Sequence, residues 1–138
     1  MDFRYNIQGG DFTQAGQASS HLKKILKSLN LSSSLIRRTV VALYEAEVNV
    51  VAHAWSGTID VRIQPDQITI DVRDCGPGII DIDLAMQKGY STASQAVREM
   101  GFGAGMGLPN IRENSDFMDI HSEPGKGTEV QIINRITE

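Results

Sequence analysis

The sequence predicts an α+β fold in which helices cover one face of a mixed, mostly antiparallel sheet. Residues 58–63 and 68–73 alternate apolar and polar side chains, as do residues 117–121 and 128–133, and this period of two is typical of strands. Two earlier stretches repeat apolar residues every three or four positions, as helices do. Helices packed on one face of a sheet make the simplest arrangement, a two-layer α/β sandwich.

Length and composition are those of one globular domain. The chain has 138 residues, 41% hydrophobic and 22% charged, so we expect residues 1–138 to form a single domain. A net charge of -4 argues against binding nucleic acid through its phosphates. The single cysteine excludes an internal disulfide, and no apolar run approaches the roughly 20 residues of a membrane span. We therefore expect a cytoplasmic protein that binds neither nucleic acid nor membrane.

The first elements are expected to be a short strand and a helix. Alternation at residues 3–7 predicts a strand that ends at a glycine pair. The helix after it has two candidate caps, Asp11 and Thr13, and its buried face carries Leu22, Ile25, Leu26 and Leu29.

A second, longer helix is expected from the serines at 32–34 to about Ala54, with Gly57 ending it. Glu47 interrupts its apolar stripe at a position where another apolar residue would fit.

Two hairpins should follow this helix. Residues 65–67 and 124–127 contain proline or glycine and separate the paired strand-like runs. Residues from about 79 to 104 have weak periodicity, and a stretch of that length is more often a functional lid than a plain connection. A further helix is expected to begin at Leu108.

Three polar residues of the long helix, Glu45, Asn49 and His53, are spaced by four and so share one stripe. Asn49 can offer a neutral oxygen to Mg²⁺, and Glu45 can accept a proton from a hydroxyl that attacks phosphorus. His53 can bond a phosphate or ribose oxygen, or it can cap the helix end. Taken alone, the stripe is equally typical of a solvated helix face.

Two glycine-bearing segments, 74–78 and 101–108, predict nucleotide binding. Glycines at alternate positions allow backbone N–H groups to surround an anion, and the second segment runs into a helix. Asp74 can accept a hydrogen bond from an exocyclic amine such as that of adenine, or it can simply belong to a turn. The candidate residues of these segments are Asp74, Gly76, Gly78, Gly101, Gly103, Gly105, Gly107 and Leu108.

Other nucleotide and metal motifs are absent from the sequence. It contains no Walker A loop, no Rossmann fingerprint, and neither the His-Arg-Asp nor the Asp-Phe-Gly motif of protein kinases. His21 and His121 lack partners at ligand spacing, so we expect no zinc site. We expect Cys75 to pack as a small buried residue.

The order of these motifs resembles the Bergerat, or GHKL, ATP-binding domain of DNA gyrase, gyrase-like heat-shock chaperones, sensor histidine kinases and MutL repair proteins. The resemblance spans about residues 35–135. It implies that the domain binds ATP and Mg²⁺, with Asn49 as the magnesium ligand and Glu45 as the general base. It also implies that Asp74 reads adenine with Thr128 nearby, and that residues 101–107 hinge a lid over the phosphates.

Within that family, the chain is most similar to free-standing bacterial anti-sigma factors and switch kinases, especially at residues 49–54 and 122–128. This implies a Mg²⁺-dependent serine/threonine kinase acting on a STAS-class antagonist protein, with a sigma factor as a further partner and a homodimer formed through residues 1–30. Some family kinases carry an arginine where this chain has Gly103, and the nearest arginine here is Arg98.

Two alternatives remain open at this stage. One is an ATP-gated binding module that regulates a sigma factor or another partner without significant phosphotransfer. The other is ATP hydrolysis without a protein acceptor.

Overall fold

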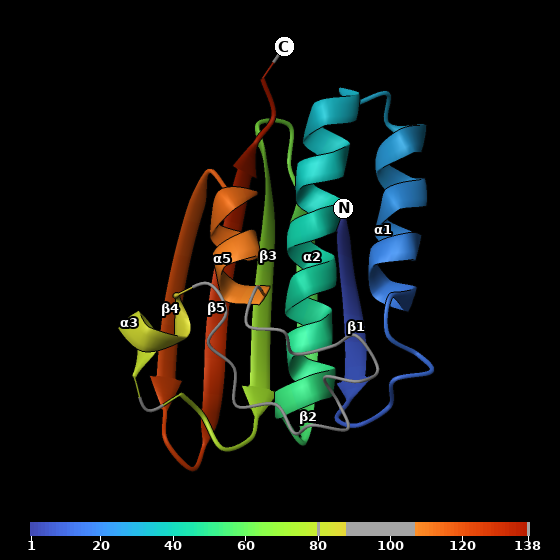
Figure 1. Cartoon of the computed structure of the whole chain (residues 1–138). Coiled ribbons are helices and arrows are strands. Elements are labelled where there is room, and N and C mark those ends of the chain that lie inside the picture. Colours follow the sequence, from blue (N-terminus) through green and yellow to red (C-terminus); the bar gives the residue numbers. More distant parts are fainter. Residues whose placement is uncertain (80, 88–106, 138) are drawn as a thin grey trace.

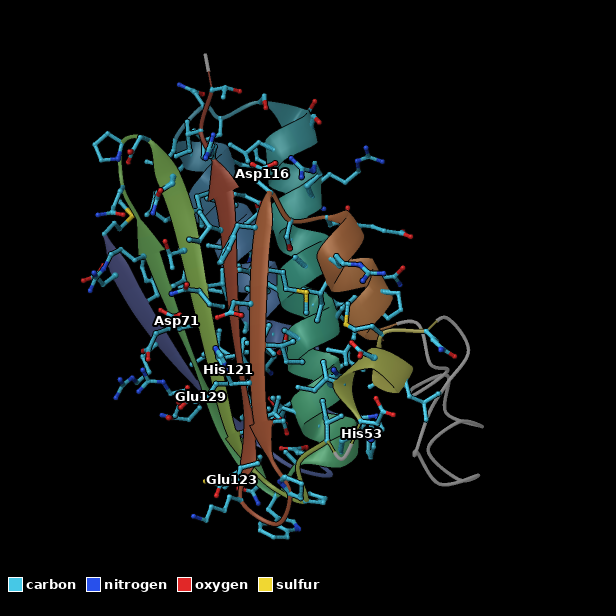
Figure 2. The ribbon with its side chains drawn as sticks, turned by 90° about the vertical axis from the view of Figure 1, so that its left-hand side faces the viewer. His53, Asp71, Asp116, His121, Glu123 and Glu129 are labelled. Carbon is cyan, nitrogen blue, oxygen red and sulfur yellow. The ribbon has the colours of Figure 1, made fainter. Side chains whose placement is uncertain are left out.

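The computed structural model of the chain consists of a five-stranded sheet that helices cover on one face (Figure 1). The structure describes residues 1–79, 81–87 and 107–137. Turned by 90°, the sheet forms one layer and the helices the other (Figure 2). The predicted α+β sandwich is therefore confirmed. The pairings among the five described strands are all antiparallel, which is simpler than the mixed sheet that the sequence allowed.

The sheet has the strand order β1-β2-β3-β5-β4, so both predicted hairpins, β2–β3 and β4–β5, are present. The last strand in the sequence lies between β3 and β4, which joins the two hairpins into one sheet. The strands are β1 (Asp2–Gln8), β2 (Ser56–Ile63), β3 (Gln67–Cys75), β4 (Phe117–Glu123) and β5 (Gly127–Arg135).

Alternation along the strands decides which face meets the helices. In β3, Ile68, Ile70 and Val72 are buried, whereas the residues between them face the open side. The side chains of Asp71, His121 and Glu129 point away from the helices in Figure 2. The open face is therefore polar, as expected for an antiparallel sheet with one solvated face.

The helical layer is centred on α2, which packs between α1 and α5 (Figure 1). Ser32 caps α2 as predicted, because its Oγ accepts a hydrogen bond from the Leu35 N–H at 3.2 Å. Fully buried leucine and isoleucine side chains from α1, α2, α5 and the sheet meet in one core. The helices are α1 (Gln17–Ser28), α2 (Ser33–His53), α3 (Ile82–Ala85) and α5 (Gly107–Glu113).

The start of α1 differs from the prediction. Neither Asp11 nor Thr13 caps it, because the helix begins only at Gln17. Its first N–H groups instead bond the buried carboxylate of Glu47 on α2, at 3.1 Å from Ala18 N and 3.3 Å from Ser19 N. This contact explains why a carboxylate interrupts the apolar stripe of α2.

Two further expectations were wrong. Gly57 does not end α2, which stops at His53 with Ala54 as its cap; Gly57 lies within β2, opposite Asp74. Cys75 is exposed rather than buried, because the last residue of β3 falls on the open face of the sheet. In the part of the chain that the structure describes, no helix is long and apolar enough to cross a membrane.

Candidate functional site

The polar stripe of α2 meets the first residue of α5. Glu45 and Asn49 are both half-buried, and Gly107 lies directly against them. A Cβ atom placed on Gly107 would lie 3.1 Å from Asn49 Oδ1 and 3.7 Å from Glu45 Oε2. Glycine therefore allows the backbone of α5 to approach a carboxylate and an amide oxygen closely.

Burial tunes the chemistry of Glu45. It raises the pKa of this carboxyl, and the Asn110 side chain opposes the rise by placing Nδ2 at 3.5 Å from Glu45 Oε1. A half-buried carboxylate with a raised pKa is a better proton acceptor than a fully solvated one. Asn110 was not among the predicted residues, although its place one helical turn after Gly107 put it within reach of the same stripe.

His53 lies in the last turn of α2, on the helix side of the molecule (Figure 2). Burial lowers the pKa of its imidazole, which favours the neutral form at neutral pH. A neutral imidazole can both donate and accept a hydrogen bond.

A second group of predicted residues gathers where β3 and β5 pair. Asp74 Oδ1 accepts a hydrogen bond from the Thr128 N–H at 2.9 Å. Burial raises the pKa of the Asp74 carboxyl, and this backbone hydrogen bond opposes the rise. Asp74 and Thr128, which the resemblance places near the adenine, are thus in direct contact with each other.

The turn after β3 joins the two groups. Gly76 N donates to the Lys126 carbonyl at 3.1 Å, and a Cβ atom on Gly76 would lie 2.9 Å from Ala54 Cα, at the end of α2. Gly78 follows with a φ of 74°, in the left-handed region. The turn therefore packs between the end of α2 and the β4–β5 hairpin.

Other predicted residues contribute differently or lie elsewhere. The Leu108 side chain is buried in the core, so its backbone is the part that remains available to a ligand. Gly101, Gly103, Gly105 and Arg98 lie outside the described residues, as does most of the predicted lid except the segment that contains α3.

The donor set suits a magnesium ion held mainly by phosphate. Among the described residues, no group of three His, Cys, Asp or Glu side chains is placed to hold a metal. Mg²⁺ commonly takes one or two protein oxygens and completes its shell with substrate phosphates and water. A single amide oxygen on Asn49, beside the open backbone of Gly107, fits that pattern.

Ser122 is a second polar residue that was not among the predicted site residues, although it begins the segment 122–128 that carries part of the resemblance. Its hydroxyl lies 2.8 Å from Thr128 Oγ1. Alternation along β4 could have pointed to it. Ser122 lies two residues after Ile120, on the face of β4 that packs against the core, and the other residues on that face are apolar.

Comparison with known proteins relates this chain to a family. The family model described as "Histidine kinase-like ATPase domain" matches residues 10–134. The serine/threonine-protein kinase RsbT of Bacillus subtilis is 30% identical over 115 residues, which cover 80% of this chain and 80% of that protein. The anti-sigma F factor of Caldanaerobacter subterraneus is 37% identical over 100 residues, which cover 69% of this chain and 66% of that protein.

A solved structure also has this fold. The SiaB-SiaC complex from Pseudomonas aeruginosa contains a chain that matches with a TM-score of 0.65 at 12% identity. The match covers 96% of this chain and 88% of that one. At this identity the likeness concerns the fold alone.

Proposed function

The chain belongs to the histidine kinase-like ATPase (GHKL) family, in the group of anti-sigma factors and switch kinases, and on that premise we propose that it is an ATP-dependent serine/threonine protein kinase. Its proposed substrate is a STAS-class regulator protein. The observation that carries this proposal is the contact of Gly107 with Glu45 and Asn49. At this contact, the proposed general base Glu45 and the proposed metal ligand Asn49 both lie close to the backbone of Gly107.

The proposed roles divide the site into a base end and a phosphate end. At the base end, Asp74 accepts a hydrogen bond from the adenine amine, with Thr128 beside it and the Gly76 and Gly78 backbone against the ring. At the phosphate end, Asn49 holds Mg²⁺, which neutralises charge on the phosphates when bound. The proposed role of His53 is a hydrogen bond to a phosphate or ribose oxygen, and that of the glycine segment is to bond the phosphates through backbone N–H groups; of that segment the structure describes Gly107.

Phosphotransfer then needs little covalent chemistry from the protein. The acceptor hydroxyl oxygen bonds to the γ-phosphorus, the bond from that phosphorus to the β,γ-bridging oxygen breaks, and ADP leaves. Glu45 accepts the hydroxyl proton, and Asn110 holds the carboxylate in place through Nδ2. The rate enhancement comes from positioning and electrostatic stabilisation.

Replacing the proposed base tests this role. Glu45→Gln should bind ATP within about 3-fold of wild type and lose at least about 100-fold in transfer of the γ-phosphoryl group, because general-base catalysis typically contributes that much. The measurement is incorporation of labelled phosphate from Mg·ATP into a STAS-class protein from the same gene neighbourhood. Glu129→Gln, on the open face of the sheet, is the matched control and should behave as wild type.

A second function is favoured by the similarity to the anti-sigma F factor. In it, ATP binding gates an interaction with a sigma factor or another regulator, and turnover is incidental. Unchanged phosphotransfer in Glu45→Gln would contradict the kinase mechanism. Unchanged regulation of the partner despite lost phosphotransfer would favour the ATP-gated module.

A further inference from the structure

The hydroxyl of Ser122 on β4 joins three segments of the chain at the base end of the site. Ser122 Oγ accepts a hydrogen bond from the Ile79 N–H at 2.7 Å and donates to the Gly127 carbonyl at 3.2 Å. It also lies 2.8 Å from Thr128 Oγ1. Ile79 directly follows the glycine turn after β3. One side chain therefore ties that turn to the β4–β5 hairpin.

The proton count of Ser122 fixes the direction of the contact with Thr128. A hydroxyl has one proton to donate and two lone pairs to accept with. If the Ser122 proton goes to the Gly127 carbonyl, the two lone pairs receive the Ile79 N–H and the Thr128 O–H, and all three contacts are satisfied. The opposite direction leaves the Gly127 contact without a proton. Thr128 therefore donates to Ser122 and keeps its own lone pairs as acceptors.

A second acceptor lies next to Thr128. Asp74 Oδ1 is occupied by the Thr128 N–H, and among the described residues no donor is bonded to Asp74 Oδ2. Asp74 Oδ2 and the Thr128 hydroxyl, which can act only as an acceptor, therefore belong to two residues in direct contact. A ligand edge that faces them must supply N–H donors. The amino group of a 6-amino purine offers two N–H donors at this position, whereas a 6-oxo purine presents an acceptor there and has N1–H as the one donor on that edge, so some of these lone pairs stay unpaired.

We propose that Ser122 is a positioning residue for nucleotide selectivity: by taking the Thr128 proton and anchoring the turn after β3, it makes the site prefer 6-amino over 6-oxo purine nucleotides. The inference rests on the proposed ATP binding and deepens it. Ser122 acts through Thr128 and the Ile79 backbone and needs no contact with the base. Its loss should therefore change the selectivity for the base more than the affinity for the phosphates.

The test compares the dissociation constants of ATP and inosine triphosphate, which differ at the 6-position of the base, by calorimetry with Mg²⁺ present. Wild type should prefer ATP. Ser122→Ala should weaken ATP binding about 10-fold and change inosine triphosphate binding less than about 3-fold, which is the scale of one misdirected hydrogen bond. Ser122→Cys, nearly isosteric but a poor hydrogen-bond partner, should lose selectivity in the same way if the alanine variant folds badly.

Two variants provide controls. Ser122→Thr keeps the hydroxyl and should therefore retain the wild-type preference for ATP over inosine triphosphate. A purely structural role of Ser122 would not tie this preference to the hydroxyl. Ser19→Ala removes another side-chain hydroxyl, bonded to the Gly16 carbonyl in α1, and should leave the ratio unchanged. A wild-type ratio in both Ser122→Ala and Ser122→Cys, or an equal loss of both nucleotides, overturns the inference while the kinase proposal stands. Failure of the wild type to bind ATP overturns both.

Discussion

At the scale of single residues, the chemistry of the proposed kinase depends on what surrounds Glu45. Burial raises the pKa of this carboxyl, and the long contact from Asn110 Nδ2 is the described interaction that lowers it again. The charged form is the one that accepts a proton, so the phosphotransfer rate should rise with pH through the Glu45 pKa and then level off. That rise should lie above the pH at which an exposed glutamate titrates.

Removing the Asn110 side chain, which contacts Glu45, should shift the pH–rate profile of phosphotransfer to higher pH. In Asn110→Ala the hydrogen bond that favours the carboxylate is gone, so the Glu45 pKa increases and the acid side of the pH–rate profile shifts to higher pH. The profile is measured under single-turnover conditions with saturating Mg·ATP. Asn6→Ala, on the edge strand β1, is the matched control and should keep the wild-type profile. A shift to lower pH would contradict the assignment of Glu45 as the base.

At the scale of secondary-structure elements, two polar contacts join elements that are far apart in the sequence. One is the carboxylate of Glu47, which takes the place of a local cap at the start of α1. Glu47→Ala leaves the Ala18 and Ser19 N–H groups without their acceptor in a buried setting, so the free energy of unfolding should fall by about 1–3 kcal/mol. Urea unfolding measures this loss. Glu47→Gln, which keeps one acceptor oxygen and most of the volume, should lose less than Glu47→Ala.

The second contact fixes the end of α5 to the strands. Asp116 follows α5 closely, and the Arg135 N–H and then the Arg38 guanidinium lower the pKa of its carboxyl. A folded-state pKa below the unfolded one gives stability that is fully present above the unfolded value, about 3.9, and is lost as the pH falls through the folded value. Asp116 therefore stabilises the folded state at neutral pH, and this contribution is lost in acid.

Asp116→Asn should be less stable than wild type at neutral pH, and the difference should shrink as the pH falls below about 4. The measurement is the urea midpoint at a series of pH values. Asp66→Asn, in the β2–β3 connection, is the control, and its difference from wild type should not follow this pH course. A constant difference between Asp116→Asn and wild type would contradict the linkage.

The same elements show how far the sequence could predict the structure. The hairpins and α2 were predictable because alternation, helical periodicity and the Ser32 cap are local signals. The start of α1 was not, since its acceptor lies on another helix, 28 and 29 residues away in sequence. Ser122 was missed for a similar reason, because its partners come from two other segments of the chain, Ile79 and the adjacent pair Gly127 and Thr128.

At the scale of the whole molecule, the proposed site draws on elements far apart in the sequence. The end of α2, the turn after β3 and the β4–β5 hairpin meet at one end of the sheet, as Figure 1 shows. Spacing of four along α2 predicted that Glu45 and Asn49 would share a stripe. That this stripe would meet Gly107 came only from the resemblance, because long-range packing leaves no periodic signal in a sequence.

Binding of ATP tests the central claim most directly. Calorimetric titration of wild type with Mg·ATP should give saturable binding at one site, and Asp74→Asn should weaken it by about 10-fold or more, because the amide presents a weaker and partly donating group to the adenine amine. Wild type that binds no ATP even at millimolar concentration, or an Asp74→Asn variant that binds as tightly as wild type, would contradict the account.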